Sequence, residues 1–127
     1  MVMSFWVNGC KFCMRYYQQT LKPVFEQLKD DPDILFVSVN ADNSLDNWEK
    51  GLSSGRYVHP DMINLHETPG TGLLDYYKIA SFPQKLFVDA DNRLLLITRQ
   101  QYKPEKLIEL IRQMKNETAE ELSTLTP

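Results

Sequence analysis

FWVNGCKFC, residues 5–13, is the stretch that decides the fold of this chain, because it joins a short apolar run to two closely spaced cysteines. Cys10 and Cys13 are the only cysteines in 127 residues. The apolar run at residues 2–7 has the length of a buried strand, and a helical pattern begins after Cys10. The pair is therefore expected where a strand passes into a helix.

The spacing of the two cysteines suits reversible redox chemistry. Side chains three positions apart are neighbours on a helix surface, so a small adjustment of the first turn brings two thiols to disulfide geometry. Unpaired N–H groups and the positive end of the helix dipole favour a thiolate at Cys10, and Lys11 adds a cation beside it. We expect a lowered pKa for Cys10 and a resolving role for Cys13.

Other roles of a cysteine pair are less well supported. A zinc site needs further ligands at local spacing, and the only histidines, His59 and His66, lie about fifty residues away and are expected on the surface or in loops. Covalent haem attachment needs a histidine where Met14 stands. No metal is therefore expected. From the spacing alone, two inert buried cysteines remain an equal alternative.

Alternating helices and strands are predicted along the rest of the chain. A helical stretch from Cys10 ends near Pro32, and Pro23 should kink or split it. The further expected elements are a buried strand at 34–40, a helix from Asn43 or Ser44 to about Leu52, a short strand at 62–67, a short helix at 72–79, two strands around a turn at 89–92, and a final helix from Pro104 with Leu107, Ile108, Leu110 and Ile111 on its apolar face. The early alternation favours parallel pairing, and the late hairpin adds antiparallel strands.

Composition predicts one globular domain, at residues 1–115. Hydrophobic residues make up 43% and charged residues 24% of the chain, and no apolar run approaches the roughly 20 residues that cross a bilayer. The net charge of −3 arises from Glu117, Glu120 and Glu121, in a tail at 116–127 that we expect to be frayed or disordered. No basic stripe indicates nucleic-acid binding, and no membrane insertion by this domain is expected.

Two separated motifs resemble the thioredoxin superfamily. FWVNGCKFC is similar to the FW-x-x-x-C-x-x-C opening of bacterial TlpA/ResA-type thiol-disulfide oxidoreductases, in the AhpC/TSA-related group. YYKIASFPQKLFVDADNRLLL, residues 76–96, is similar to that family's stretch of tyrosine, aliphatic residue, proline, apolar strand and hairpin aspartate. The resemblance implies a thioredoxin-like three-layer α/β fold, with a central mixed β-sheet flanked by helices and a TlpA-type insertion, residues 57–70, before a cis-proline.

The resemblance also assigns roles to individual residues. It implies that Pro83 is the cis-proline and that the backbone of Phe82 binds an extended segment of a partner protein. Without it, Pro83 would be interpreted as a proline that begins a strand. Trp6 corresponds to the family's tryptophan near the dithiol. Its plain interpretation is core packing, and the two roles are compatible because a large ring can shield the sulfurs while it fills space. Lys11 and Phe12, between the cysteines, are expected to tune or shield the pair.

Several departures from the family pattern bear on activity. Lys11 and Phe12 stand where relatives usually have proline, or glycine with proline, and Gly9 replaces a tryptophan, so we expect a more oxidising pair. Ser4 stands six residues before Cys10, where thioredoxins proper have a buried acid for proton transfer. Ordinary thioredoxin activity is therefore not implied.

Other departures concern the frame of the fold. Pro23 falls later than the family's helix-kinking proline, whose place Gln18 takes. The family's leading β-hairpin is absent, so we expect the parent protein to extend before Met1. A peroxiredoxin is excluded, because Val7 and Met3 replace its Thr or Ser and its proline.

The sequence therefore predicts a thiol-disulfide oxidoreductase that uses Cys10 and Cys13 and no further cofactor. Its partners would be cysteine-containing proteins and an upstream thiol reductant or oxidant, and it would be a monomer. The family implies a periplasmic or other cell-envelope location, with a role such as cytochrome c maturation or general thiol exchange; the cytoplasm is the alternative location. The alternative function is a redox-inactive thioredoxin-like module that binds a partner protein.

Overall fold

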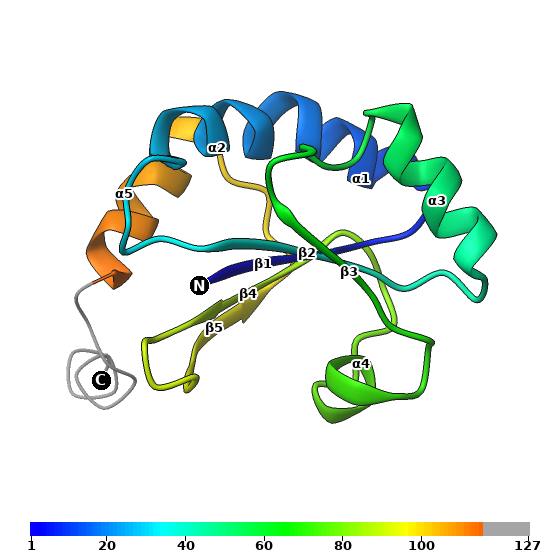
Figure 1. Ribbon diagram of the computed structural model, residues 1–127. Helices are drawn as coiled ribbons and strands as arrows, with labels where there is room; N and C mark the ends of the chain where they lie inside the picture. Colours follow the sequence, from blue (N-terminus) through cyan, green and yellow to red (C-terminus); the bar gives the residue numbers. More distant parts are fainter. Residues whose placement is uncertain (116–127) are drawn as a thin grey trace.

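The computed structural model describes residues 1–115, which form a five-stranded mixed sheet with helices on both faces (Figure 1). The strands are β1 (Val2–Trp6), β2 (Phe36–Asn40), β3 (Ile63–His66), β4 (Gln84–Val88) and β5 (Leu94–Thr98), in the order β3-β2-β1-β4-β5. Strands β1, β2 and β3 are parallel, whereas β4 is antiparallel to both β1 and β5. This arrangement confirms the expected three-layer α/β fold.

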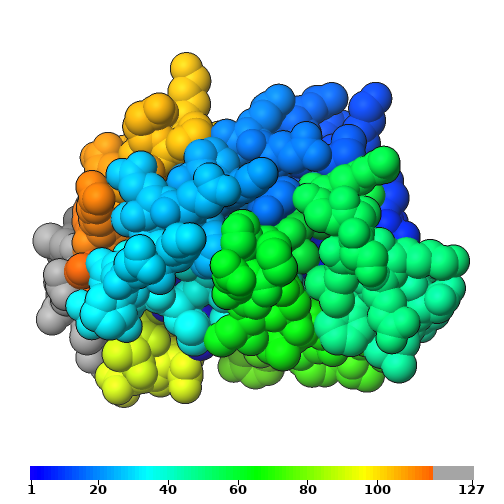
Figure 2. Space-filling view, turned by 45° about the horizontal axis from the view of Figure 1, so that its top comes forward, coloured from blue at the N-terminus to red at the C-terminus, as the bar shows by residue number. Residues whose placement is uncertain are grey.

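Most of the helices cover one face of the sheet. These are α1 (Lys11–Tyr16), α2 (Lys22–Leu28), α3 (Leu45–Ser54) and α5 (Pro104–Met114), whereas the short α4 (Gly72–Tyr76) lies on the other face (Figure 1). Figure 2 looks onto the helix-covered face, where the blue segment that includes α1 and α2 runs between the orange α5 and the green region of α3 and β3.

The first helical stretch runs through Pro23 and is irregular just before it. A π-helical turn, η1 (Tyr17–Leu21), joins α1 to α2, and Lys22 N–H donates to the carbonyl of Tyr17, five residues back. Pro23 then lies in the first turn of α2, directly after the π-helical turn. The irregular turn just before Pro23 thus divides the stretch into α1 and α2.

The ends of α3 follow local signals. Ser44, rather than Asn43, caps the helix, and its hydroxyl accepts the N–H of Asn47 at 3.2 Å. Gly55 ends the helix with a φ of +68°, a conformation that glycine adopts without strain. The helix thus ends at Ser54, two residues later than expected, whereas α4 ends at Tyr76, earlier than the expected residue 79.

Two apolar cores lie on opposite faces of the sheet. Under the helices, Val2 and Phe87 pack with Val24 of α2 and Leu107 of α5. On the other face, Met3 and Phe5 pack with Leu74 of α4. Every residue of β2 is buried, as expected for an interior strand. The expected apolar face of α5 is present: Leu107 and Ile111 are buried, and Ile108 and Leu110 are partly buried against the same core.

The expected tail at 116–127 lies outside the described residues. Within residues 1–115, no helix combines the length and the apolar character that crossing a membrane requires.

Candidate active site

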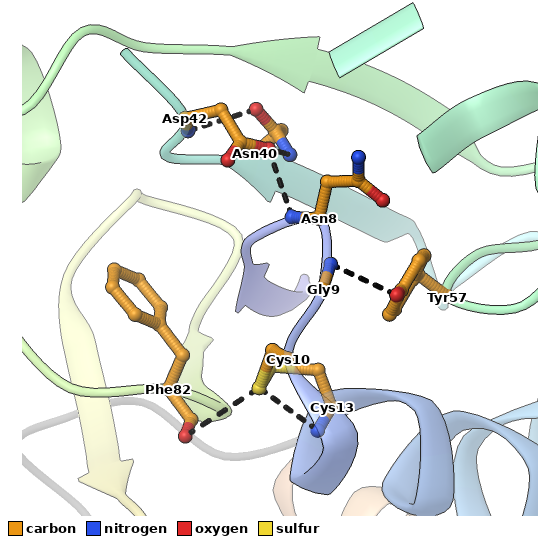
Figure 3. Close-up of a disulfide and its surroundings, with 8 residues drawn as sticks. All are labelled: Asn8, Gly9, Cys10, Cys13, Asn40, Asp42, Tyr57 and Phe82. Carbon is orange, nitrogen blue, oxygen red and sulfur yellow. Dashed lines mark hydrogen bonds between the residues drawn. A yellow bond between two sulfur atoms is a disulfide. The ribbon is translucent and has the colours of Figure 1, made fainter. Parts of the chain in front are cut away.

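The two cysteines lie at the strand-to-helix junction that the sequence predicts. Strand β1 ends at Trp6, and after a short loop Cys10 is the N-cap residue of α1. Gly9 has a φ of +86°, which only glycine adopts easily, and it turns the chain into the helix. Cys10 and Cys13 form a disulfide with their Cα atoms 5.2 Å apart (Figure 3).

The two sulfurs differ in accessibility and in hydrogen bonding. Cys13 is only 2% exposed, whereas Cys10 is partly exposed. The backbone N–H of Cys13 donates to Sγ of Cys10 at 3.1 Å (Figure 3). A donor of this kind at a helix N-terminus stabilises negative charge on sulfur. The geometry therefore gives a partner access to Cys10 and keeps Cys13 inside.

Phe82 and Pro83 meet the cysteines from a distant part of the chain. The Phe82–Pro83 peptide bond is cis, as the resemblance implies, and Pro83 is buried directly before β4. The carbonyl oxygen of Phe82 lies 3.9 Å from Sγ of Cys10 (Figure 3). A disulfide sulfur cannot donate a hydrogen bond, but a Cys10 thiol at this position can donate to that carbonyl.

Trp6 is buried in the same cluster as Cys13. It is 2% exposed and shares a buried cluster with Cys13 and Tyr57. The Trp6 and Tyr57 rings stack with their centroids 4.9 Å apart. Gly51 of α3 makes room for this arrangement, because a Cβ atom there would lie 2.6 Å from the Trp6 ring. Trp6 is thus part of the core next to Cys13, and its shielding of the sulfurs stays a prediction.

The loop before Cys10 is held by two residues that the sequence analysis did not single out. The Tyr57 hydroxyl accepts the N–H of Gly9 at 2.9 Å, and Asp42 Oδ2 accepts the N–H of Asn8 at 2.8 Å (Figure 3). Asn40 donates to the same carboxylate at 2.7 Å. No local pattern distinguishes these side chains from other polar residues near strand ends, so only the tertiary structure identifies them.

Both histidines have structural partners. His66 Nε2 lies 2.8 Å from the carbonyl oxygen of Asp42, and its ring stacks on Trp48 with centroids 5.3 Å apart. His59 Nδ1 accepts the N–H of Asp61 at 3.0 Å. Within residues 1–115, no group of three or more His, Cys, Asp or Glu side chains is placed to hold a metal ion.

Lys11 and Phe12, between the cysteines, point to solvent. Lys11 is exposed, and the Phe12 ring is 63% exposed with the Arg15 guanidinium 5.8 Å from its centroid. Phe12 also borders a surface hollow of about 500 Å³, which Arg15 lines from the same helix and Tyr102 and Lys103 line from the segment before α5. Apolar surface beside Cys10 is therefore available to a partner.

A buried lysine also lies under α1, and the sequence analysis did not identify it. Lys85 of β4 pairs with Ser4 of β1, and its side chain is fully buried. Its Nζ donates to the carbonyl of Gln100 at 2.6 Å and lies 4.5 Å from the centroid of the Tyr16 ring. Burial lowers the pKa of Lys85 to about 8. A lone lysine in an apolar strand is ordinarily interpreted as a solvent-facing residue, which is why sequence reasoning missed it.

A family model matches most of the chain. Residues 1–94 match the family model described as thioredoxin-like. No curated protein matches the chain.

Solved structures show the same architecture. The exposed lipoprotein thioredoxin of Streptococcus pneumoniae is similar with a TM-score of 0.71 and 18% identity, covering 89% of this chain and 83% of that one. A secreted disulfide oxidoreductase of Mycobacterium tuberculosis, homologous to DsbE of E. coli, has a TM-score of 0.68 and 17% identity, covering 89% and 80%. StoA of Bacillus subtilis has a TM-score of 0.68 and 16% identity, covering 85% and 78%. At these identities the likeness shows a shared fold.

Proposed function

Because this chain belongs to the thioredoxin-like family, we propose that it is a thiol-disulfide oxidoreductase that acts on cysteine-containing proteins through Cys10 and Cys13. The observation that carries the proposal is the unequal environment of the two sulfurs. Cys10 is accessible and accepts a backbone N–H at a helix N-terminus, while Cys13 is buried one turn further on. Two inert packed cysteines would not need this asymmetry.

The exchange uses only the cysteine pair. In the reducing direction, the Cys10 thiolate attacks a disulfide of the partner, the partner's S–S bond breaks, and one partner sulfur leaves as a thiolate. The Cys13 thiolate then attacks Cys10, forms the internal disulfide and releases the second partner sulfur. The two electrons that reduce the partner come from the dithiol. An upstream thiol reductant restores it, and the same steps in reverse oxidise a partner.

Partner docking is assigned to the surface around Cys10. In this proposal the backbone of Phe82, next to the cis bond to Pro83, binds an extended segment that carries the partner's cysteine. The support is that the Phe82 carbonyl oxygen lies 3.9 Å from Sγ of Cys10. The exposed Phe12 ring supplies apolar contact beside it. Lys11 and Phe12 replace the family's usual residues between the cysteines. We propose that this replacement makes the Cys10–Cys13 pair more oxidising than the pairs of relatives.

We also propose a location in the bacterial cell envelope. Support comes from two of the similar structures, which are an exposed lipoprotein and a secreted oxidoreductase. Candidate roles there are cytochrome c maturation and general thiol exchange, carried out by a monomer.

Trapping of mixed disulfides tests the function. In Cys13→Ser, the partner should remain bonded to Cys10 because the resolving thiol is missing, so non-reducing gels of cells that express the variant should show adducts that disappear on reduction. Cys10→Ser/Cys13→Ser is the matched control and should form none. Equal adduct patterns in the two variants would contradict the proposal.

A further inference from the structure

Lys85 presents an unusual combination of charge and burial. Its side chain has no exposed surface, and none of the ion pairs formed by the described residues includes it. A buried ammonium group without a carboxylate is costly in free energy. A site that retains such a cation calls for an explanation beyond packing.

The groups that face Lys85 supply partial charges only. They are Ser4 of β1, Thr98 of β5, the Tyr16 ring of α1 and the carbonyl of Gln100 after β5. Tyr16 is the only titratable group among them, and burial raises its pKa, so it is neutral over the whole physiological range. Among the described residues, none of these partners of Lys85 carries a full charge.

The cation and the buried sulfur lie under the same helix, α1. Along β1, Val2, Ser4 and Trp6 project to the same face; Val2 packs with residues of α2, and Trp6 packs with Cys13. Lys85 pairs with Ser4, between these two. On the helix, Tyr16 follows Cys13 by three residues, a rise of about 4.5 Å, and both are buried. The Lys85 Nζ, which lies 4.5 Å from the centroid of the Tyr16 ring, is thus under the same short helix that carries Cys13.

We propose that Lys85 is the buried positive charge that stabilises the thiolate of Cys13 in the reduced protein, and that it thereby sets how fast the mixed disulfide is resolved. Opposite charges within an apolar interior interact strongly because water does not screen them. Lys85 acts through its positive charge alone and does not contact the reacting partner. The inference rests on the oxidoreductase function and assigns a residue to its second step.

The chemical step is the resolution already described. Cys13 loses its proton to solvent, its thiolate attacks Cys10, the bond between Cys10 and the partner breaks, and the partner's sulfur leaves with the electron pair. Lys85 neither gives nor takes electrons. At neutral pH it is largely protonated, because its pKa is about 8, so its charge is in place when Cys13 ionises.

Titration of Cys13 in the reduced Cys10→Ser variant tests the inference without any partner. Thiolate absorbance near 240 nm against pH should show Cys13 titrating about one unit lower than in Cys10→Ser/Lys85→Met, the lower end of shifts caused by a nearby opposite charge. Cys10→Ser/Lys85→Gln keeps a donor for Gln100 but loses the charge, so it should behave like the methionine variant. Cys10→Ser/Lys106→Met removes an exposed lysine and should change nothing. Equal titration with and without the Lys85 charge would overturn the inference.

A second measurement keeps Lys85 intact. By reciprocity, the Cys13 thiolate must raise the pH at which Lys85 titrates. The ¹³Cε resonance of Lys85 should therefore titrate higher in Cys10→Ser than in Cys10→Ser/Cys13→Ala, and identical curves would contradict the inference even if every Lys85 variant failed to fold.

The kinetic consequence separates this inference from the proposed function. A one-unit rise in the pKa of Cys13 lowers the fraction of Cys13 thiolate about tenfold at pH 7. The remaining thiolate is more nucleophilic, which restores part of the rate. Lys85→Met should therefore slow resolution of a glutathione mixed disulfide about threefold. Adduct trapping by Cys13→Ser does not depend on Lys85. Loss of the Lys85 effect with trapping intact would refute only the inference, whereas absent adducts would refute the function.

Discussion

At the scale of single residues, the two sulfurs of the pair differ in exposure and in hydrogen bonding. Cys10 is partly exposed and accepts the N–H of Cys13 at 3.1 Å, so the start of α1 favours its thiolate. Cys13 is buried against Trp6. The ionisation of Cys13 therefore depends on groups in the interior. In our proposal the cation of Lys85 is the group that favours its thiolate. Lys11, although adjacent to Cys10 in sequence, is exposed and acts through water.

Lys11 should therefore have a small effect on the redox potential. Lys11→Gln removes a cation that favours the reduced thiolate, so the potential should fall, by about 10 mV, because exposed charge interactions contribute less than about 1 kcal/mol. Equilibration with glutathione buffers, followed by tryptophan fluorescence, measures the change. An unchanged or higher potential would show that Lys11 does not favour the reduced form.

Lys85 should make stability depend on pH. Its pKa is about 8 in the folded protein and 10.5 in the unfolded chain, so between these values the unfolded chain binds the extra proton and rising pH favours folding. From pH 7 to pH 9 the oxidised protein should gain about 1 kcal/mol in unfolding free energy relative to Lys85→Met. Urea unfolding of both proteins at the two pH values checks this. A difference that stays constant with pH would contradict the lowered pKa.

At the scale of elements, the active site depends on how α3 and residue 57 pack against the end of β1. Gly51 lets α3 approach the Trp6 ring, and Tyr57 stacks on the same ring while its hydroxyl fixes Gly9. The predicted insertion at 57–70 thus begins with a residue that supports the cysteine loop. The π-helical turn before Pro23 similarly lets one helical stretch run from Cys10 across the sheet.

Gly51→Ala tests the packing of α3 on Trp6. The new Cβ would meet ring atoms at 2.6 Å, closer than real contacts allow, so the variant should lose about 1–3 kcal/mol despite the better helix propensity of alanine. Thermal or urea unfolding measures the loss. Ser53→Ala, at an exposed position of the same helix, is the control and should be near neutral. A stabilised Gly51→Ala would show that α3 does not pack on Trp6 in this way.

At the scale of the whole molecule, what the sequence predicts and what it misses have separate physical causes. The cysteine junction, the buried strands and the Asp89–Asn92 turn follow from local periodicity and turn chemistry, so the order of elements was predictable from the residues. The thioredoxin-like fold and the redox role of the sulfur pair were implied by the family resemblance. Tyr57 and Asp42 reach the site through hydrogen bonds between distant segments, and Lys85 lies beside Ser4 through pairing of distant strands. Local sequence patterns do not predict such contacts. The cis bond at Pro83 was implied only by family resemblance.

The equilibrium redox potential of the Cys10–Cys13 pair tests the central claim most directly. A pair that exchanges disulfides with partners should equilibrate with dithiol buffers in the range of thioredoxin-like oxidoreductases, between about −270 and −120 mV. A static structural disulfide would stay oxidised below about −300 mV. We predict a potential in the first range, and a value below about −300 mV would contradict an exchange function of this pair.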